Sequence, residues 1–344
     1  MDPVSQAVVG AVVSGIAAKK EDMRSWLAIG ALSAMSADLD ILISSSDDPL
    51  LNLTFHRHFT HSLVFVPIGA LICACVLSFL LRQSWKSIYL PAFLGYATAG
   101  PLDALTSYGT HLFWPFTQER TAWSVISIVD PIYTITLLIF VGLAMIKLKK
   151  KFIYVSLIFM LLWHSFGWLQ SERAEETLLA YAKEKNIKVE RVWVQPSIFN
   201  LFVWRALIES PQKIHVTCVH VGINSKIYHS GNYNRYQLRN DKKLKESSVL
   251  LEDIERFTHF SSGFVARVQV EGQEVLTDAR YSPMPWGMDP LWALELNYKD
   301  PERHARMNFY RNTDSVRMIE LWEAILGRGI FDSRAELIFC PVGK

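Results

Sequence analysis

Long apolar runs fill the first half of the chain, and charged residues gather in the second half. Two uncharged runs, 62–81 and 152–171, have twenty residues each, enough for a helix to cross about 30 Å of hydrocarbon. Runs at 87–102 and 131–146 are shorter, and those at 3–18 and 25–37 are rich in small residues that allow close packing of membrane helices. The pattern predicts about six membrane-spanning helices, which occupy 3–18, 25–37, 62–81, 87–102, 131–146 and 152–171.

The loops between these runs alternate in charge. Three of them are basic, and all three would lie on the same side of the membrane: Lys19, Lys20 and Arg24; Arg82 and Lys86; and Lys147, Lys149, Lys150 and Lys151. The positive-inside rule makes that side cytoplasmic. The N-terminus, the loops 41–61 and 107–129, and all residues after 171 are then expected outside the cytoplasm.

The periodicity changes after residue 171. Segments that alternate, or are rich in β-branched and aromatic residues, predict strands, whereas 173–187 and 248–260 have helical patterns. The strand segments are 189–196, 213–221, 264–281 with a hairpin turn at 271–273, and 291–298. We therefore predict an α-helical multispan membrane bundle at 1–171, followed by a soluble, extracytoplasmic α+β domain at 172–344.

Composition narrows the class of protein. A net charge of +2 and the absence of a basic stripe with interleaved aromatic residues argue against nucleic-acid binding. The first residues lack a basic segment ahead of an apolar core, so no cleavable signal peptide is expected. The four cysteines have no zinc-finger spacing; Cys218 and Cys340 would pair only in an oxidising compartment.

Acidic residues and histidines gather at one membrane face in this topology. Asp38 and Asp40 end the second predicted span, and the sequence HRHFTHS places His56, His58 and His61 before the third. Two carboxylates two positions apart point differently on a continuous helix but can converge at a frayed helix end. With Thr60 or Ser62 as N-cap, His61 would lie in the first turn, where a neutral imidazole is favoured. His58 is expected to face solvent. The alternative for each group is a polar helix end or a solvated loop.

Further polar residues lie at the same face. Asp103 ends the fourth span, and Thr106 lies one turn beyond it on the same face. Asp130 followed by Pro131 is typical of a helix start, and this competes with a catalytic role. His164, inside the last span, is expected to make one buried hydrogen bond. Asp130 and Thr106 are the candidate catalytic side chains.

The combined set is one of imidazoles and carboxylates: Asp38, Asp40, His56, His61 and Asp103. Such ligands suit a divalent metal, Zn²⁺ or Mn²⁺, better than a metal that prefers thiolates. A cation there could polarise a phosphoryl or acyl oxygen and activate a bound water. The pattern thus predicts a divalent-metal site at a membrane surface.

Several motifs together resemble the YdjM-type (YbcI-like) family of membrane-bound metal-dependent hydrolases. They are MDPVSQAVVGA, ADLDILI, HRHFTHSL, LDALTSYGTHLFWPF, RTAWSVISIVDPIYT, PSIFNLFVWR and LTDARY, in that order along the chain. The resemblance implies a multispan protein of the bacterial inner membrane whose metal ligands map onto Asp38, Asp40, His56, His61 and Asp103. A distant similarity to zinc-dependent phospholipases and nucleases suggests phosphodiester or lipid-like substrates.

The chain departs from this family's pattern at a few positions. The family's histidine four residues before the aspartate of the fourth span is replaced here by Ala99, which breaks an i, i+4 ligand pair. Relatives often have glycine in place of His58, and some have histidine in place of Gln6. His58 or His164 would have to compensate, or the metal site is weakened.

Two other functions stay open at this point. A non-catalytic membrane scaffold would keep the bundle and a structural metal, with the outer domain binding a partner. A transporter is a third hypothesis, because charges near the membrane often mark ion paths. Against it, the polar residues lie at one face and do not line a path across.

Overall fold

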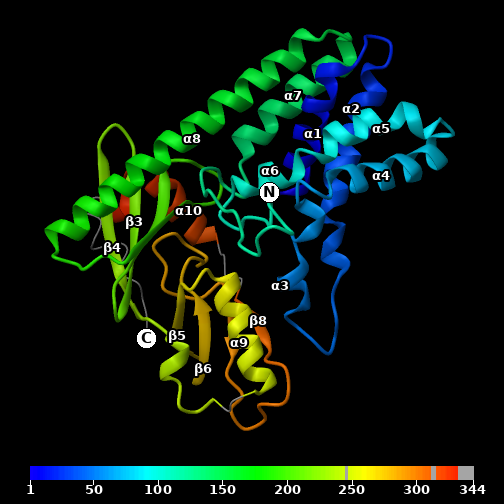
Figure 1. The fold of residues 1–344 in the computed structure, drawn as a ribbon. Coiled ribbons are helices and arrows are strands. Elements are labelled where there is room, and N and C mark those ends of the chain that lie inside the picture. Colours follow the sequence, from blue (N-terminus) through cyan, green and yellow to red (C-terminus); the bar gives the residue numbers. More distant parts are fainter. Residues whose placement is uncertain (245–246, 311–314, 332–344) are drawn as a thin grey trace. The chain divides into compact units, whose positions relative to one another are not determined.

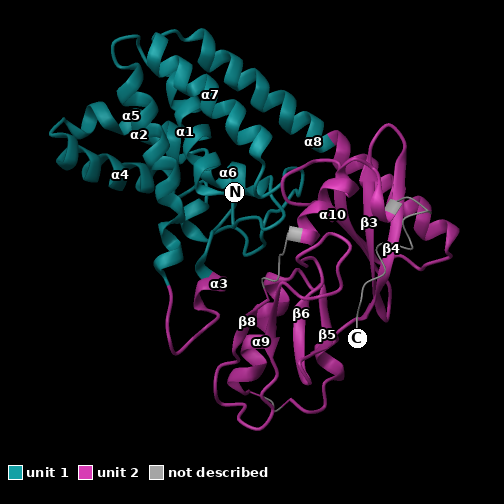
Figure 2. Ribbon diagram, turned by 180° about the vertical axis from the view of Figure 1, so that it is seen from behind, with its two compact units in different colours: residues 1–43, 55–168 teal, residues 44–54, 169–344 magenta. Residues whose placement is uncertain are grey.

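The computed structural model describes residues 1–244, 247–310 and 315–331. The chain forms two compact units, shown in different colours in Figure 2. Unit 1 contains residues 1–43 and 55–168, and unit 2 contains residues 44–54 and 169–344. The assignment of 1–171 to the membrane and of 172–344 to the exterior stays a prediction.

Unit 1 is helical (Figure 1), and two of its helices, α1 and α7, begin at an aspartate that caps them. Asp2 accepts hydrogen bonds from backbone amides at the start of α1, and Asp130 does so at the start of α7; a proline follows each cap. The elements are α1 (Pro3–Ala17), α2 (Met23–Ser36), η1 (Ala37–Leu42), η2 (Phe59–His61), α4 (Val66–Leu81), α5 (Trp85–Tyr96), α6 (Ala99–Ala104), α7 (Pro131–Lys147) and α8 (Lys151–Glu184), with α3 (Leu51–Phe55) at the junction of the units.

Helices occur at each of the six predicted positions, but most are short. In the part of the chain that the structure describes, two helices are long and apolar enough to span a membrane, Met23–Leu42 and Lys151–Glu184. A third is obtained if Leu51–His61 and Val66–Leu81, which meet at 90°, form one broken span. The prediction of about six spans is therefore not supported. The fourth predicted span is divided between α5, which has twelve residues, and α6.

Glycines bring the backbones of α1, α2 and α5 into contact. A Cβ atom built on Gly10 would lie 2.5 Å from the carbonyl oxygen of Gly30, and one on Gly95 would lie 2.2 Å from the same oxygen. Neither distance is compatible with a side chain, so these positions require glycine. The expected close packing of the first two helices is thus observed, and α5 joins them.

One local prediction about a helix cap is wrong, and one helix prediction is confirmed. Neither Thr60 nor Ser62 caps α4, because that helix begins only at Val66 after a short 3₁₀ turn. The helix predicted at 173–187 is confirmed as far as Glu184, where it is the last part of α8.

Unit 2 contains two four-stranded antiparallel sheets, which confirms strands at all four predicted segments. The first has the order β1 (Arg191–Pro196), β2 (Val203–Glu209), β3 (Lys213–Val221), β4 (Ser225–Asn234), and the second β5 (Val265–Val270), β6 (Gln273–Asp278), β7 (Trp292–Glu295), β8 (Met307–Phe309). The predicted hairpin turn joins β5 to β6, where Glu271 and Gly272 both have positive φ. The remaining elements are η3 (Leu238–Asn240), α9 (Val249–Phe260), α10 (Ser315–Ile325) and η4 (Gly329–Phe331).

Each sheet of unit 2 buries one face against a helix. Leu178 and Ala182, near the end of α8, pack with Trp204 of β2. Ile254 and Phe257 of α9, a helix predicted from the sequence, pack with Leu276 and Leu294 of the second sheet. Cys218 is buried in β3. Cys340 lies outside the described residues, so whether it pairs with Cys218 stays open.

A buried carboxylate ties the loop after β4 to the second sheet. Asp241 accepts hydrogen bonds from the hydroxyls of Tyr298, at 2.7 Å, and Tyr236, at 3.0 Å, and pairs with Arg267. Burial alone would raise the pKa of Asp241, but these donors outweigh it and hold that pKa below its ordinary value of 3.8.

Candidate metal centre

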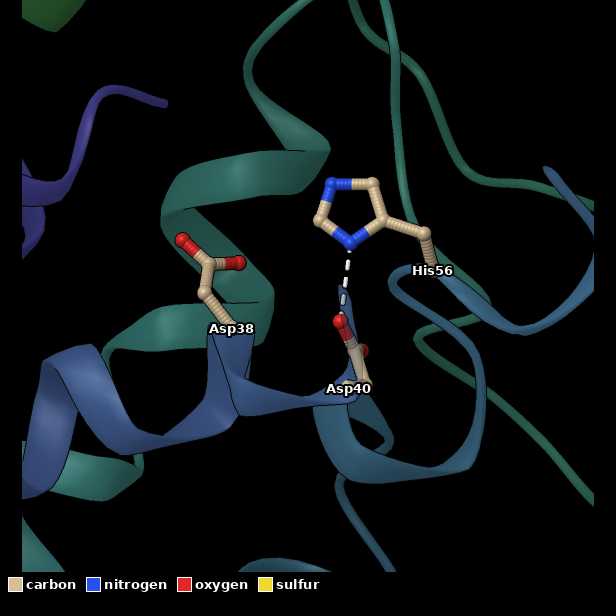
Figure 3. A group of neighbouring side chains, drawn as sticks. All are labelled: Asp38, Asp40 and His56. Carbon is tan, nitrogen blue, oxygen red and sulfur yellow. Dashed lines mark hydrogen bonds and ion pairs between the residues drawn. The ribbon is translucent and has the colours of Figure 1, made fainter. Parts of the chain in front are cut away.

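The 3₁₀ segment η1 brings Asp38 and Asp40 to the same side of the chain. Residues two apart differ in direction by about 160° on an α-helix but by about 120° on a 3₁₀ helix. The end of α2 continues as η1 from Ala37 to Leu42, so both carboxylates turn toward the histidine loop. Figure 3 shows both side chains on one stretch of the ribbon, with the His56 ring hydrogen-bonded to Asp40.

Asp40 organises the histidine loop. It is 3 % exposed, and its Oδ1 lies 2.8 Å from His56 Nδ1. Its Oδ2 accepts hydrogen bonds from the Arg57 backbone N–H at 2.9 Å and the Thr60 hydroxyl at 2.5 Å. The same oxygen lies 3.3 Å from His61 Nδ1. One carboxylate thereby fixes both histidine rings.

His61 lies between two further carboxylates. Its Nε2 is 3.2 Å from Asp38 Oδ1 and 3.2 Å from Asp103 Oδ2, and the ring is fully buried. Two ligands of one tetrahedral zinc ion lie roughly 3.4 Å apart, given bond lengths near 2.1 Å. The His61 Nε2 and the two carboxylates therefore already have the spacing of ligands around a single ion.

Gly100 allows α6 to approach the histidine loop and deliver Asp103. A Cβ atom at Gly100 would lie 2.1 Å from the carbonyl oxygen of His61, so only glycine permits this packing. Asp103 follows one turn later and is completely buried. The helix position that the family gives to histidine, Ala99, is also buried.

Three further groups surround Asp103, and sequence reasoning did not assign them to the site. Gln6 donates a hydrogen bond from Nε2 to Asp103 Oδ2 at 2.8 Å, while its buried Oε1 has no hydrogen-bond partner among the described residues. Arg57 Nε lies 3.2 Å from the same Asp103 oxygen, and the α-amino group of Met1 pairs with Oδ1. The arginine between His56 and His58 was the only sequence signal for this positive charge.

Other predicted residues lie apart from this cluster. Thr106 donates its hydroxyl hydrogen bond to the carbonyl oxygen of Asp103, within its own turn. Asp130 caps α7 and accepts from the indole of Trp163 at 2.9 Å. His164 contacts the Tyr133 hydroxyl at 3.1 Å, as expected for one buried hydrogen bond.

His58 was expected to face solvent, and this is wrong. Its ring packs against His111, with centroids 4.5 Å apart, and against Trp114. Its aromatic neighbours come from the loop after α6, whose proximity to the histidine loop is not visible in the sequence pattern.

The residues present fit a divalent cation. Two groups of three side chains, each with all ligand atoms within 4.8 Å of one another, share Asp38: one adds Asp40 and His56, the other His61 and Asp103. The unpartnered oxygen of Gln6 is a further neutral donor beside the second group. Carboxylate, imidazole and amide oxygen donors suit Zn²⁺ and Mn²⁺. Arg57 and the Met1 amino group pair with Asp103, so two positive charges would lie beside a metal ion bound there.

A comparison with models of protein families shows which family the chain belongs to. The model for the YdjM inner membrane protein family matches residues 1–174, which contain every residue of the cluster. The chain belongs to the YdjM inner membrane protein family. No curated protein and no solved structure matched the chain.

The YdjM match ends shortly after α8 leaves unit 1, so it does not extend to the sheets of unit 2. Unit 2 has its own group of potential ligands, Asp48, Asp253 and His304. Arg256 pairs with both carboxylates, at 3.0 Å from Asp48 and 3.3 Å from Asp253. These contacts form an ion-pair network that joins the 44–54 loop to α9.

Proposed function

We propose that this YdjM family member is a membrane-embedded hydrolase that uses a divalent metal at the cluster of Asp38, Asp40, His56, His61 and Asp103. The single observation that carries the proposal is the position of His61 Nε2, 3.2 Å from a carboxylate oxygen on each side. Helices of unit 1 hold these groups within an apolar surrounding, where unpaired carboxylates are costly. The three carboxylates carry more negative charge than Arg57 and the Met1 amino group balance, which supports a further cationic ligand.

The residues divide into ligands and orienting groups. Asp38, His61 and Asp103 would hold the ion, and His56 with Asp40 offers a second, adjoining position. Asp40 and Thr60 contact His61 Nδ1, so they fix the ring and leave Nε2 for the metal, the usual arrangement of a metal-binding histidine. When bound, the metal would polarise a substrate oxygen and lower the pKa of a water molecule.

We propose a phosphodiester or other lipid-like compound as the substrate class. The mixed carboxylate and imidazole donor set is suited to metal-assisted attack of water on phosphoryl or acyl centres. Thr106 and Asp130, the predicted catalytic side chains, have structural partners, so the proposal depends on the ligand cluster and not on them.

We further propose that the protein lies in the bacterial inner membrane as a multi-pass protein, with unit 2 outside the cytoplasm. The basic loops at 19–24, 82–86 and 147–151 support this orientation. Alkaline phosphatase fused after residue 331 should be active in cells, because the enzyme folds only outside the cytoplasm. An inactive fusion, with an active control fused after residue 46 in the loop that follows the second predicted span, would overturn the orientation.

Metal analysis of the purified protein tests the proposal. We expect about one or two equivalents of Zn²⁺ or Mn²⁺ per chain, lost in a His61→Ala, Asp103→Ala double variant. A His164→Ala, Asp22→Ala double variant is the matched control, because it removes the same residue types outside the cluster. A native protein that binds no stoichiometric metal would remove the basis of the hydrolase proposal.

A second candidate function is a non-catalytic membrane scaffold with a structural metal site. It is favoured by the cations beside Asp103, since Arg57 and the Met1 amino group already balance part of the acidic charge. Ala99, which replaces a histidine of the family's pattern, also favours the scaffold, because one potential ligand is missing. Metal binding without turnover of any phosphodiester would favour the scaffold.

A further inference from the structure

An apolar groove in unit 1 adjoins the ligand cluster. It has a volume of about 370 Å³, within the range of small-molecule sites. Its walls come from the end of α2, from η1 and from α4, and its floor includes Tyr96 of α5. The wall residues are mainly aliphatic: Leu32, Leu39, Ile43, Ile72, Val76 and Leu77.

The groove meets the ligand cluster at two of its lining residues. Asp40 and Thr60 line it and are joined by a 2.5 Å hydrogen bond, and Ser33 and Ser36 of α2 are further polar lining residues. Asp40 also contacts His56 at 2.8 Å and is one of the potential metal ligands. The groove and the cluster therefore share a residue, and a molecule lying in the groove would present one end to the cluster.

Several aliphatic residues that line the groove are exposed at the surface of unit 1. Ile72 and Val76 of α4 are 54 % and 55 % exposed, and Leu39 of η1 is 61 % exposed. In a family of inner membrane proteins, aliphatic surface on an apolar helix such as α4 is covered by lipid hydrocarbon. A nucleotide or sugar would find few polar partners along these walls, whereas a hydrocarbon chain matches them.

We propose that the groove binds the hydrocarbon chain of a bilayer amphiphile, whose polar group then lies at Asp40 and Thr60 beside the metal ligands. This inference rests on the proposed function for the chemistry, and it names the substrate class as a membrane lipid with a flexible acyl chain. A chain gains little by moving from bilayer to groove, because lipid tails are as apolar as leucine. The groove therefore orients the acyl chain of the substrate, and contacts of its polar group at Asp40 and Thr60 select the substrate.

Photo-crosslinking tests the groove directly. The full-length protein is placed in phosphatidylglycerol vesicles containing a trace of phosphatidylglycerol with a diazirine on one acyl chain. After irradiation, peptides are mapped by mass spectrometry. We expect labelling of 68–77 at least fivefold above that of 135–146 on α7, a helix with equally exposed apolar residues. Equal labelling of the two helices, as for ordinary surrounding lipid, would overturn the proposal.

Matched substitutions make the test specific. Ile72→Trp fills the groove, and Ile139→Trp makes the same change at a position of α7 with nearly the same exposure, 55 %. We expect the first to reduce labelling of 68–77 at least fivefold and the second to leave it unchanged. Val76→Trp is a second groove variant in case the first does not fold. Unchanged labelling in a folded groove variant would contradict the inference.

Mn²⁺ titration separates failure of the groove from failure of the proposed function. Both tryptophan variants at the groove should bind Mn²⁺ within twofold of the native protein, because the ligands are untouched. If the native protein labels at the groove but binds no Mn²⁺, the lipid-binding inference stands and the hydrolase proposal fails. If the native protein binds Mn²⁺ but α4 and α7 are labelled equally, the lipid-binding inference fails and the hydrolase proposal stands.

Discussion

Nε of Arg57 lies 3.2 Å from Oδ2 of Asp103, the oxygen that also lies 3.2 Å from His61 Nε2. A guanidinium and an imidazole thus share one carboxylate oxygen at the point where a metal would bind. Arg57 also has a left-handed backbone, with φ of 60°, which is uncommon for residues other than glycine. The loop holds this side chain against the cluster.

Arg57→Met should strengthen divalent metal binding. Without the positive charge of Arg57, the negative charge of the ligand carboxylates is less neutralised. A metal ion is then attracted more strongly and binds with a more favourable free energy. We expect Mn²⁺ affinity to rise several-fold in isothermal titration, while the metal-free protein melts at a lower temperature. Arg57→Lys, which keeps the charge and the same backbone requirement, should bind as the native protein does. Weaker Mn²⁺ binding by a folded Arg57→Met variant would mean that the arginine orders the ligands.

Asp38→Asn should weaken metal binding more than His56→Ala. Asp38 belongs to both groups of potential ligands, whereas His56 belongs to one. We expect the loss of Mn²⁺ affinity to exceed about 100-fold for Asp38→Asn and to be about tenfold for His56→Ala, by comparison with known effects around metal sites. Similar losses for the two variants would argue against a shared ligand.

Gly100→Ala should destabilise the protein and weaken the site together. The new methyl group would lie 2.1 Å from the His61 carbonyl oxygen, so α6 or the histidine loop must shift, at a cost of about 1–3 kcal/mol. Gly142→Ala is the control, because no atom lies within 4 Å of a Cβ there; it should be neutral or stabilising by up to about 1 kcal/mol. Thermal unfolding and Mn²⁺ titration measure both effects. Equal behaviour of the two variants would contradict the packing described.

Acidification should destabilise unit 2 through Asp241. Because the folded-state pKa of Asp241 lies below its ordinary value, this residue contributes stability above pH 3.8 that is lost as the pH falls through the lower folded value. Asp241→Asn should lower the melting temperature at pH 7 and reduce the drop between pH 7 and pH 3. The full-length protein in detergent serves for differential scanning fluorimetry. If the melting temperature of Asp241→Asn changed with pH as that of the native protein does, Asp241 would be excluded as a source of the acid destabilisation.

The sequence pattern predicted helix positions and several strands well because the local signals agree there. β3 has the predicted bounds 213–221, and α9 begins one residue after Ser248, which caps it. β2 was missed because all its residues are buried, Arg205 included, so no alternation is visible. β4 was missed because its sequence is largely polar.

The number of spans was overestimated because hydrophobicity reports burial as well as lipid contact. Ala99 and Ala104 lie in an apolar stretch, yet they belong to the short helix α6, which is buried in unit 1. The cluster itself was partly foreseeable, since Asp38, Asp40, His56, His61 and Asp103 lie together. Gln6 and Arg57 were not, because their proximity to Asp103 depends on packing between distant segments.

The contacts among Gly10, Gly30 and Gly95 have a consequence for how the molecule can adapt. Backbones that touch cannot slide past one another, so α1, α2 and α5 form a rigid frame. The ligand-bearing segments η1 and η2 are short 3₁₀ turns, a form that often marks a hinge. Laboratory evolution toward a new substrate should therefore accumulate its changes at the positions of 36–43 and 56–62 that carry no metal ligand, while the three glycines remain unchanged.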